Sequence, residues 1–215
     1  MKVQLFVEVI EFRVFSYLLN YLWKPIPKER NMLEISFEPF PVLSTERLLL
    51  RKMTEADLND VFLLRSDTRV MQFIDRPLAL SIDDAVEFFK RVNASFLSNE
   101  GIHWALALKP AADLIGIISY WRIMKEHHRA EMGYMLKPEF HRKGLMQEAI
   151  SIVIGYGFDT MKLHSIEANV NPNNLPSIAL LERNHFVREA YYKENYYYNG
   201  RFLDSAVYSL INPKE

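Results

Sequence analysis

The spacing of apolar positions divides the first half of the chain into one strand and two helices. Residues 45–53 ("TERLLLRKM") are dense in leucine and predict a first strand. Apolar residues then recur at helical spacing over 55–66 and again over 83–97, which predicts two helices. A hydroxyl residue followed three positions later by an acid is typical of a helix start. This capping pattern precedes both helices, as Thr54 with Asp57 and as Ser81 with Asp84.

In the second half, extended segments alternate with helices. A helix is expected over 143–158, and another begins at Asn174, which is a suitable N-cap. The last two strands are joined around Asn199 and Gly200, a pair typical of hairpin turns. The remaining strands are expected at 103–109, 114–124, 130–136 and 164–170.

This order of elements predicts the α+β class. It gives seven strands, flanked by helices, with one strand–helix–strand crossover over 129–170. No internal repeat or second-domain linker is visible, and 215 residues fit one domain with an appendage. We therefore expect a domain at 40–215 and an N-terminal extension of unknown role at 1–39. A translation start at Met32 is an alternative interpretation of the first 31 residues.

The N-terminal segment is apolar but is not expected to enter a membrane. Glu8, Glu11 and Arg13 interrupt the run of about 20 apolar residues that a span requires. Lys2 is the only early cation, and no small-residue cleavage site follows, which argues against a signal peptide.

Composition excludes several classes of function. The formal net charge of −1 favours neither nucleic acid nor a membrane surface as a partner. The absence of cysteine excludes a disulfide scaffold, a thiolate metal site and a cysteine nucleophile, and we expect a cytoplasmic protein. The six histidines show no metal-ligand spacing, so no metal is expected.

One glycine stands between two cations and a helix start, in "PEFHRKGLMQEA" at 138–149. A helix N-terminus exposes unpaired N–H groups and about half a positive charge. Gly144, together with Arg142 and Lys143, therefore predicts a seat for a phosphate group. The alternative is a plain helix start with solvated cations. The phosphate-cradling and dinucleotide glycine motifs are absent, so nucleotide hydrolysis and dinucleotide redox chemistry fit poorly.

The stretch "HRKGLM" resembles the Q/R-x-x-G-x-G/A motif of the GNAT acyltransferase superfamily. In that superfamily the motif opens the helix after the fourth strand and holds the pyrophosphate of acetyl-coenzyme A. The chain differs from the motif at His141 and Met146. Its surroundings resemble the RimJ/RimL-type branch, which contains ribosomal-protein N-terminal acetyltransferases. The likeness spans about 40–212 in order, through "TERLLLRKMTEADLNDVF", "AEMGYMLKPEF", "NPNNLPSIALLERNHFV" and "YYYNGRFLDSAVYSLI".

The resemblance implies a mixed, mostly antiparallel seven-stranded sheet flanked by helices, the acyl-CoA N-acyltransferase fold. It also implies acetyl-CoA as the acyl donor and no metal. The fourth strand would splay from the fifth, so that backbone groups near its end hold the pantetheine arm. The implied cofactor-binding residues are Tyr134, Met135, Leu136, His141, Arg142, Lys143, Gly144, Leu145, Met146, Asn174 and Ser177.

The same resemblance implies two catalytic residues. Ser177 would hydrogen-bond the leaving sulfur, and Glu131 on the fourth strand would relay a proton from the acceptor amine. Helix capping for Asn174, an ordinary first-turn serine and a salt-bridged Glu131 are the alternatives. Elsewhere in the superfamily a tyrosine acid lies four residues past the serine, and here that position is Leu181.

The closing strands carry a further substitution. The RimL-like branch has a glutamate just before its final turn, where this chain has Tyr196, and Glu194 would share a strand face with it. Tyr196 belongs to a group of five tyrosines. Most of the group is expected to pack in the core or across strands, and some members to line a cleft rim. The five are Tyr191, Tyr192, Tyr196, Tyr197 and Tyr198.

The leading hypothesis is an acetyl-CoA-dependent N-acetyltransferase in which the amine attacks directly in a ternary complex. Little base machinery is visible, which suits a protein N-terminal α-amine (pKa about 7.7–8.0) better than a lysine (about 10.4). The acceptor would then be a peptide, with a ribosomal protein as one candidate. A small-molecule amine (a polyamine, amino acid or antibiotic) and a non-catalytic acyl-CoA-binding module are the alternatives. No direct nucleic-acid or membrane partner is expected, and the protein would be a monomer or a homodimer.

Overall fold

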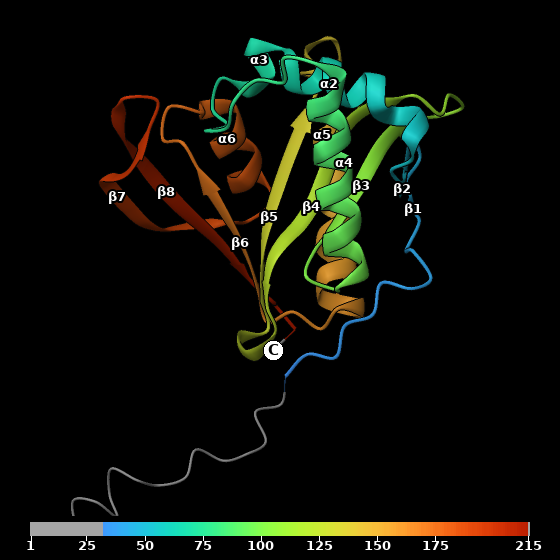
Figure 1. Ribbon diagram of the computed structural model, residues 1–215. Helices are drawn as coiled ribbons and strands as arrows, with labels where there is room; N and C mark the ends of the chain where they lie inside the picture. Colours follow the sequence, from blue (N-terminus) through green and yellow to red (C-terminus); the bar gives the residue numbers. More distant parts are fainter. Residues whose placement is uncertain (1–31, 215) are drawn as a thin grey trace, which may run out of the picture. The chain divides into compact units, whose positions relative to one another are not determined.

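An eight-stranded sheet runs through the computed structural model, which describes residues 32–214 (Figure 1). Its strand order is β1-β2-β3-β4-β5-β6-β8-β7, and all neighbours are antiparallel except β5 and β6. The predicted mixed, mostly antiparallel sheet is confirmed, and a two-residue strand, β1, adds an eighth member. The strands are β1 (Leu43–Ser44), β2 (Leu48–Lys52), β3 (Ile102–Leu108), β4 (Leu114–Met124), β5 (Arg129–Leu136), β6 (Ser165–Val170), β7 (Val187–Tyr198) and β8 (Arg201–Ile211).

Helices cover both faces of this sheet. Buried side chains of α2 and of the start of α4 pack on one face, and those of α5 and α6 pack on the other, where Phe96 at the end of α4 joins them. The expected helices are confirmed, and a short helix, α3, was not anticipated from the sequence. The α-helices are α2 (Leu58–Ser66), α3 (Thr68–Met71), α4 (Ile82–Leu97), α5 (Leu145–Gly155) and α6 (Leu175–Arg183); the short turns are η1 (Glu55–Asp57), η2 (Lys125–His127), η3 (Pro138–Phe140) and the π-helical η4 (Tyr156–Thr160).

The predicted helix caps are all present. Both capping boxes form as expected, ahead of η1 and of α4. Asn174 caps α6 by accepting a hydrogen bond from the backbone N–H of Ser177, at 3.2 Å. A cap of this kind contributes about 1 kcal/mol, so local sequence fixes where these helices begin.

The core extends toward the N-terminus beyond the expected domain boundary. Residues 33–214 belong to one compact unit, and Leu33 and Phe37 lie in its core. A domain start at residue 40 stays a prediction. The expectations for residues 1–31 lie outside the described residues.

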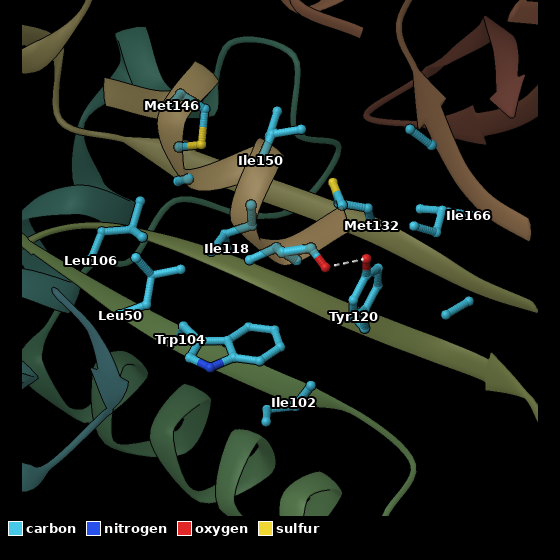
Figure 2. Close-up of a cluster of buried hydrophobic side chains, with 14 of the residues drawn as sticks. Leu50, Ile102, Trp104, Leu106, Ile118, Tyr120, Met132, Met146, Ile150 and Ile166 are labelled. Atoms are coloured by element: carbon cyan, nitrogen blue, oxygen red, sulfur yellow. Dashed lines mark hydrogen bonds between the residues drawn. The ribbon is translucent and has the colours of Figure 1, made fainter. Parts of the chain in front are cut away.

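The larger core cluster fastens α5 to the sheet. Trp104, Tyr120 and Ile118 meet Met146 and Ile150 of the helix (Figure 2). The Tyr120 hydroxyl donates a hydrogen bond to a backbone carbonyl of α5, that of Val153, at 2.9 Å. A buried phenol needs such a partner. The bond therefore helps to fix the position of α5 relative to β4.

The pairing of β5 with β6 is short. In the described part of the chain it consists of three register pairs: Arg129 with Ser165, Ala130 with Ile166, and Glu131 with Glu167. Beyond Glu131 the two strands diverge (Figure 1). The predicted crossover is confirmed, and the rest of β5 pairs with β4 on one side only.

The β7–β8 hairpin turns where the sequence predicted. Asn199 and Gly200 both have positive φ, 47° and 80°, as a two-residue hairpin turn requires. Most of the tyrosine group was expected to pack in the core or across strands. Tyr197 does pack across strands, edge-on against Phe202, but none of the five belongs to the core clusters of the described residues. Tyr191, Tyr192 and Tyr197 are exposed, because β7 is the edge strand of the sheet and pairs with β8 alone.

Replacing Gly157 by alanine is expected to destabilise the domain. A Cβ at this position would lie 2.5 Å from the Tyr120 Oη, so the buried phenol and its hydrogen bond would have to shift. Such overpacking costs about 1–3 kcal/mol, measurable by urea unfolding.

Gly155→Ala is the matched control. Position 155 has helical φ and ψ and open space around an added Cβ, so alanine should raise the free energy of unfolding by up to about 1 kcal/mol. Equal effects of the two variants would contradict this description of the helix end.

Candidate active site

A cleft of about 530 Å³ opens where β5 and β6 diverge. Its lining comes from β3 to β8, from α4 and α6, and from the loop before α4. The structure therefore brings together side chains that are far apart in the sequence. Five predicted residues line the cleft: Glu131, Tyr134, Met135, Asn174 and Ser177.

Alternation along β5 sends its side chains to opposite sides of the sheet. Met132 and Leu136 pack in the core beneath α5, whereas Met135 packs against the cluster formed with α2 and α4. Tyr134 therefore projects toward α5 and α6, and Glu131 projects toward α4. The cleft thus has one ionisable group on each side of the same strand.

Glu131 is a buried carboxylate, with 4% of its surface exposed. Its Oε2 lies 3.2 Å from Nη1 of Arg122, yet it accepts no hydrogen bond from the described residues. Burial raises the pKa of Glu131 to about 7, against the opposing attraction of Arg122. A group with this pKa in a cleft is suited to exchange protons near neutral pH.

Tyr134 and Ser177 form a hydroxyl pair on the opposite side. The two oxygens are 2.7 Å apart. Burial raises the pKa of Tyr134 to about 12, so the phenol stays protonated at neutral pH. Sequence reasoning assigned Tyr134 a backbone role only. Its side-chain partner lies 43 residues away, and no local pattern indicates that contact.

The glycine junction has the conformation that the sequence suggested. Gly144 is the N-cap of α5 with φ of 74°, and Arg142 also has positive φ, 60°. A Cβ on Gly144 would approach only Nη2 of Arg47, at 3.5 Å. The left-handed backbone, rather than crowding, is therefore the reason for glycine here.

Arg47 is a residue that the sequence analysis missed. Its guanidinium donates to the carbonyl oxygen of Lys143 at 2.9 Å and to Oε2 of Glu148 at 2.7 Å. These bonds hold the junction against the start of β2 and add a third cation beside Gly144. Only the tertiary structure joins Arg47 to a segment about 100 residues further along the chain.

The side chains of the junction residues do not line the cleft. Leu136, Leu145 and Met146 are buried in the core, and His141 Nε2 contacts the carbonyl oxygen of Leu136 at 2.8 Å. Any contact of the three buried residues with a cofactor therefore falls mainly to their backbone groups, whereas the ring of His141 is exposed. Arg142 and Lys143 are exposed and keep their cationic ends available.

The side of the cleft that faces α4 carries further polar groups. His103 faces it with a buried Nδ1 that has no hydrogen-bond partner among residues 32–214. Burial lowers the pKa of His103 to about 4, so the ring is neutral. Asp75 accepts a hydrogen bond from the Tyr196 hydroxyl, which joins the loop before α4 to β7 at the cleft.

Glu194 does not replace the glutamate of the RimL-like pattern. A register shift between Tyr192 and Tyr196 breaks the alternation of β7. Glu194 lies in this bulge with φ of 50°, and it is exposed. Tyr196 lines the cleft, but Glu194 is not among the described residues that do. The shared strand face predicted for the two residues was therefore wrong.

The model of the acetyltransferase (GNAT) domain family matches residues 47–187. The chain belongs to the GNAT family. It is a GNAT N-acetyltransferase, and the resemblance inferred from its motifs is confirmed. The match covers the capped helices, the crossover and the junction at Gly144.

Curated relatives include characterised and uncharacterised acetyltransferases. An uncharacterized N-acetyltransferase of Bacillus subtilis, YoaA, is 34% identical over 82% of this chain and 99% of its own length. A ribosomal protein uS5-alanine N-acetyltransferase of Escherichia coli is 31% identical over 47% of this chain and 53% of its own. A spermidine N(1)-acetyltransferase of Vibrio cholerae is 25% identical over 74% of this chain and 89% of its own.

Solved structures share the fold of this GNAT acetyltransferase. A GNAT-family acetyltransferase from Bacillus anthracis superposes with a TM-score of 0.71, at 27% identity over 80% of this chain and 98% of its own. Spermidine N-acetyltransferase from Vibrio cholerae, solved with CoA and spermine, gives 0.69 at 24% identity over 78% and 96%. Among the described residues of the present chain, no helix is long and apolar enough to cross a membrane, and no cluster of three metal-ligand side chains is found.

Glu131→Gln is expected to change how the stability of the GNAT domain depends on pH. The carboxyl pKa is raised from 4.5 to about 7 in the folded state, so the folded protein holds a proton that the unfolded chain releases between these values. Wild-type stability should therefore fall as pH rises through this window, by up to about 3 kcal/mol. The glutamine variant should lack that fall.

Chemical unfolding at the two ends of the window, below the lower and above the higher pKa, is the measurement for this test. Glu126→Gln, which removes an exposed carboxylate, is the control for the change in net charge. A wild-type domain whose free energy of unfolding is constant across the window would contradict the assignment of a buried, protonated Glu131.

Proposed function

We propose that this N-acetyltransferase transfers the acetyl group of acetyl-CoA to the N-terminal α-amine of a peptide or protein, by direct attack in a ternary complex. The observation that carries the proposal is the position of Glu131, a carboxyl that lines the cleft while only 4% of its surface is exposed. This burial raises its pKa to about 7. An α-ammonium group, with a pKa of about 7.7–8.0, lies roughly one unit above it. A lysine ammonium near 10.4 lies more than three units above it, so Glu131 is matched to an α-amine.

The charges of the cleft support the same class of acceptor. Its charged lining residues are Asp75 and Glu131 on one hand and Arg76 and Arg122 on the other, two acids against two bases. A polyamine carries several positive charges and binds best where negative charge is in excess. Such an excess is missing from the described lining, whereas a peptide terminus brings one ionisable amine and polar backbone groups.

A small amine is the second candidate, because the Asp75 carboxylate faces the cleft and a remote amine group could bind it. The similarity of the chain to a spermidine N(1)-acetyltransferase also supports a small amine as the acceptor. The family and its curated relatives are N-acetyltransferases. They therefore argue against the alternative of a non-catalytic acyl-CoA-binding module.

The residues present fit acetyl-CoA, which supplies a thioester carbonyl and a thiol leaving group. Backbone groups of Tyr134, Met135 and Leu136 on the diverging side of β5 would hold the pantetheine arm. The N–H groups after Gly144 and the two cations that precede it suit the diphosphate. The set comprises the backbone of His141, Gly144, Leu145 and Met146, the side chains of Arg142 and Lys143, and, nearer the thiol, Asn174 and Ser177.

The two faces of β5 divide the catalytic roles. Glu131, on the α4 side, receives the proton of the attacking amine, directly or through one water. Ser177, on the α6 side, donates a hydrogen bond to the leaving sulfur. A backbone N–H of β5 stabilises the charge that develops on the carbonyl oxygen. Because base and hydroxyl lie on opposite sides of one strand, acceptor and donor can be bound together, as a ternary complex requires.

A panel of acceptors tests the proposed substrate class. Thiol release from acetyl-CoA at pH 7 should be fastest, by about tenfold or more in kcat/KM, with peptides that have a free α-amine. Slower acceptors should be N-terminally blocked lysine peptides and spermidine, because their amines are almost fully protonated at this pH. A preference for spermidine would establish the second candidate instead.

Glu131→Gln belongs in the same experiment. It should lower kcat/KM for the preferred peptide and remove the acidic limb of the pH profile near 7, and Glu126→Gln should change neither. An acidic limb that persists in the glutamine variant would exclude Glu131 as the base.

A pair of glycine variants tests the proposed diphosphate seat. Gly144 and Gly200 both have positive φ, 74° and 80°, with no side chain closer than 3.5 Å to an added Cβ. Alanine should therefore cost each site a similar amount of stability, about 1–2 kcal/mol. Only Gly144→Ala should also raise the KM for acetyl-CoA and the Kd for CoA, by about tenfold, as expected for a weakened charge-assisted hydrogen bond.

The two readouts separate binding from folding. Stability is measured by thermal unfolding without ligand, and affinity by calorimetric titration with CoA. If both variants lose CoA affinity equally, or if neither loses any, the diphosphate does not bind at Gly144.

A further inference from the structure

The hydroxyl pair of Tyr134 and Ser177 differs from the other hydroxyls of the cleft. These two oxygens bond to each other at 2.7 Å, whereas each remaining hydroxyl is bonded to a backbone carbonyl or to a side-chain amide or carboxylate. Ser177 is the only hydroxyl residue of α6, whose sequence is "LPSIALLER". One turn further on, Leu181 is fully buried in the core. The remaining hydroxyls are those of Ser119, Tyr196 and Ser205.

We propose that the Tyr134 hydroxyl is a positioning group, which orients and polarises Ser177 so that the serine O–H points at the leaving sulfur of the acyl donor. This inference rests on the role proposed above for Ser177. It assigns the side chain of Tyr134 a part in the reaction that is distinct from any backbone contact of β5.

The direction of the hydrogen bond follows from the chemistry of the two groups. A phenol is more acidic than an alcohol, so it is the better donor, and the alcohol oxygen is the better acceptor. Tyr134 therefore donates to Ser177 Oγ, and the serine hydrogen is left for a third atom. Donation into an oxygen also strengthens the bond that the same hydroxyl donates onward.

The backbone around Ser177 fixes the position of its side chain. Its N–H donates to Oδ1 of Asn174 at 3.2 Å, in the first turn of α6. Tyr134 is held from the other side by β5, where it packs against the larger core cluster. The cap therefore holds the backbone of Ser177 and the phenol holds its oxygen, which leaves little freedom for its hydroxyl.

Positioning explains the geometry better than acid catalysis by Tyr134. The pKa of this phenol is about 12, and that of a thiol is about 8.5. Transfer of the phenolic proton toward a departing thiolate would be unfavourable by more than three pKa units. Tyr134 therefore keeps its proton, and the thiolate is stabilised by a hydrogen bond from Ser177.

Kinetics of three variants test the proposal: Tyr134→Phe, Ser177→Ala and the double variant. Tyr134→Phe removes one oxygen and should lower kcat about tenfold, with little change in the KM for acetyl-CoA. Ser177→Ala should lower kcat by about 10- to 100-fold, the range of a hydrogen bond to a charged group. The double variant should match Ser177→Ala alone, because Tyr134 acts through the serine.

Tyr156→Phe is the matched control. Tyr156 is partly buried, packs on Trp104 and does not line the cleft, so loss of its hydroxyl should leave kcat unchanged. If the effects of Tyr134→Phe and Ser177→Ala multiply instead, Tyr134 contributes by packing and the proposal is wrong.

A second readout needs no turnover. The thiol pKa of bound CoA can be followed by the ultraviolet absorbance of the thiolate in the binary complex. The wild-type protein should lower this pKa below that of free CoA. Tyr134→Phe and Ser177→Ala should each bring it back toward the free value, and Tyr156→Phe should not.

The outcomes distinguish the inference from the proposed function. If Ser177→Ala alters kcat and the thiol pKa but Tyr134→Phe alters neither, the inference is wrong and the role of Ser177 stands. If Ser177→Ala alters neither quantity, the proposed role of Ser177 is wrong and the inference falls with it. A different preferred acceptor in the substrate panel leaves the thiol pKa test intact.

Discussion

The short ladder between β5 and β6 is the constraint on which the rest of the site depends. Three register pairs hold the strands together, and beyond Glu131 they part. Backbone donors and acceptors in a sheet normally satisfy one another, and leaving them unpaired is costly. Here the unpaired backbone groups of β5 lie at the cleft, where a ligand can form hydrogen bonds with them. The same divergence gives access to both faces of β5.

Access to both faces lets one strand present two different ionisable side chains to the cleft. Alternation places Glu131 on the side of α4 and Tyr134 on the side of α6, three residues apart. The carboxyl is buried enough to hold its proton near neutral pH, and the phenol is buried enough to remain a donor. A carboxyl and a hydrogen-bond donor therefore lie on opposite faces of β5 and point away from each other.

The buried Glu131 and the junction before α5 both lower the stability of the fold. A buried Glu131 weakens the fold as pH rises, and positive φ at Arg142, which is not a glycine, strains the junction before α5. The larger core offsets these costs by fixing α5 to β4 through Tyr120. Arg47 ties the strained junction to β2.

The sequence by itself determined the local features of this protein. Capping boxes, the Asn199–Gly200 turn and the glycine before α5 are all specified by a few neighbouring residues, because backbone hydrogen bonds and φ preferences act over that range. The family resemblance added the cleft residues Glu131 and Ser177. Only the tertiary structure decided which distant side chains meet: Tyr134 with Ser177, Arg47 with Lys143, and the bulge that turns Glu194 away. Such contacts and the pKa of a buried carboxyl depend on how helices pack on the sheet, and no local pattern encodes that packing.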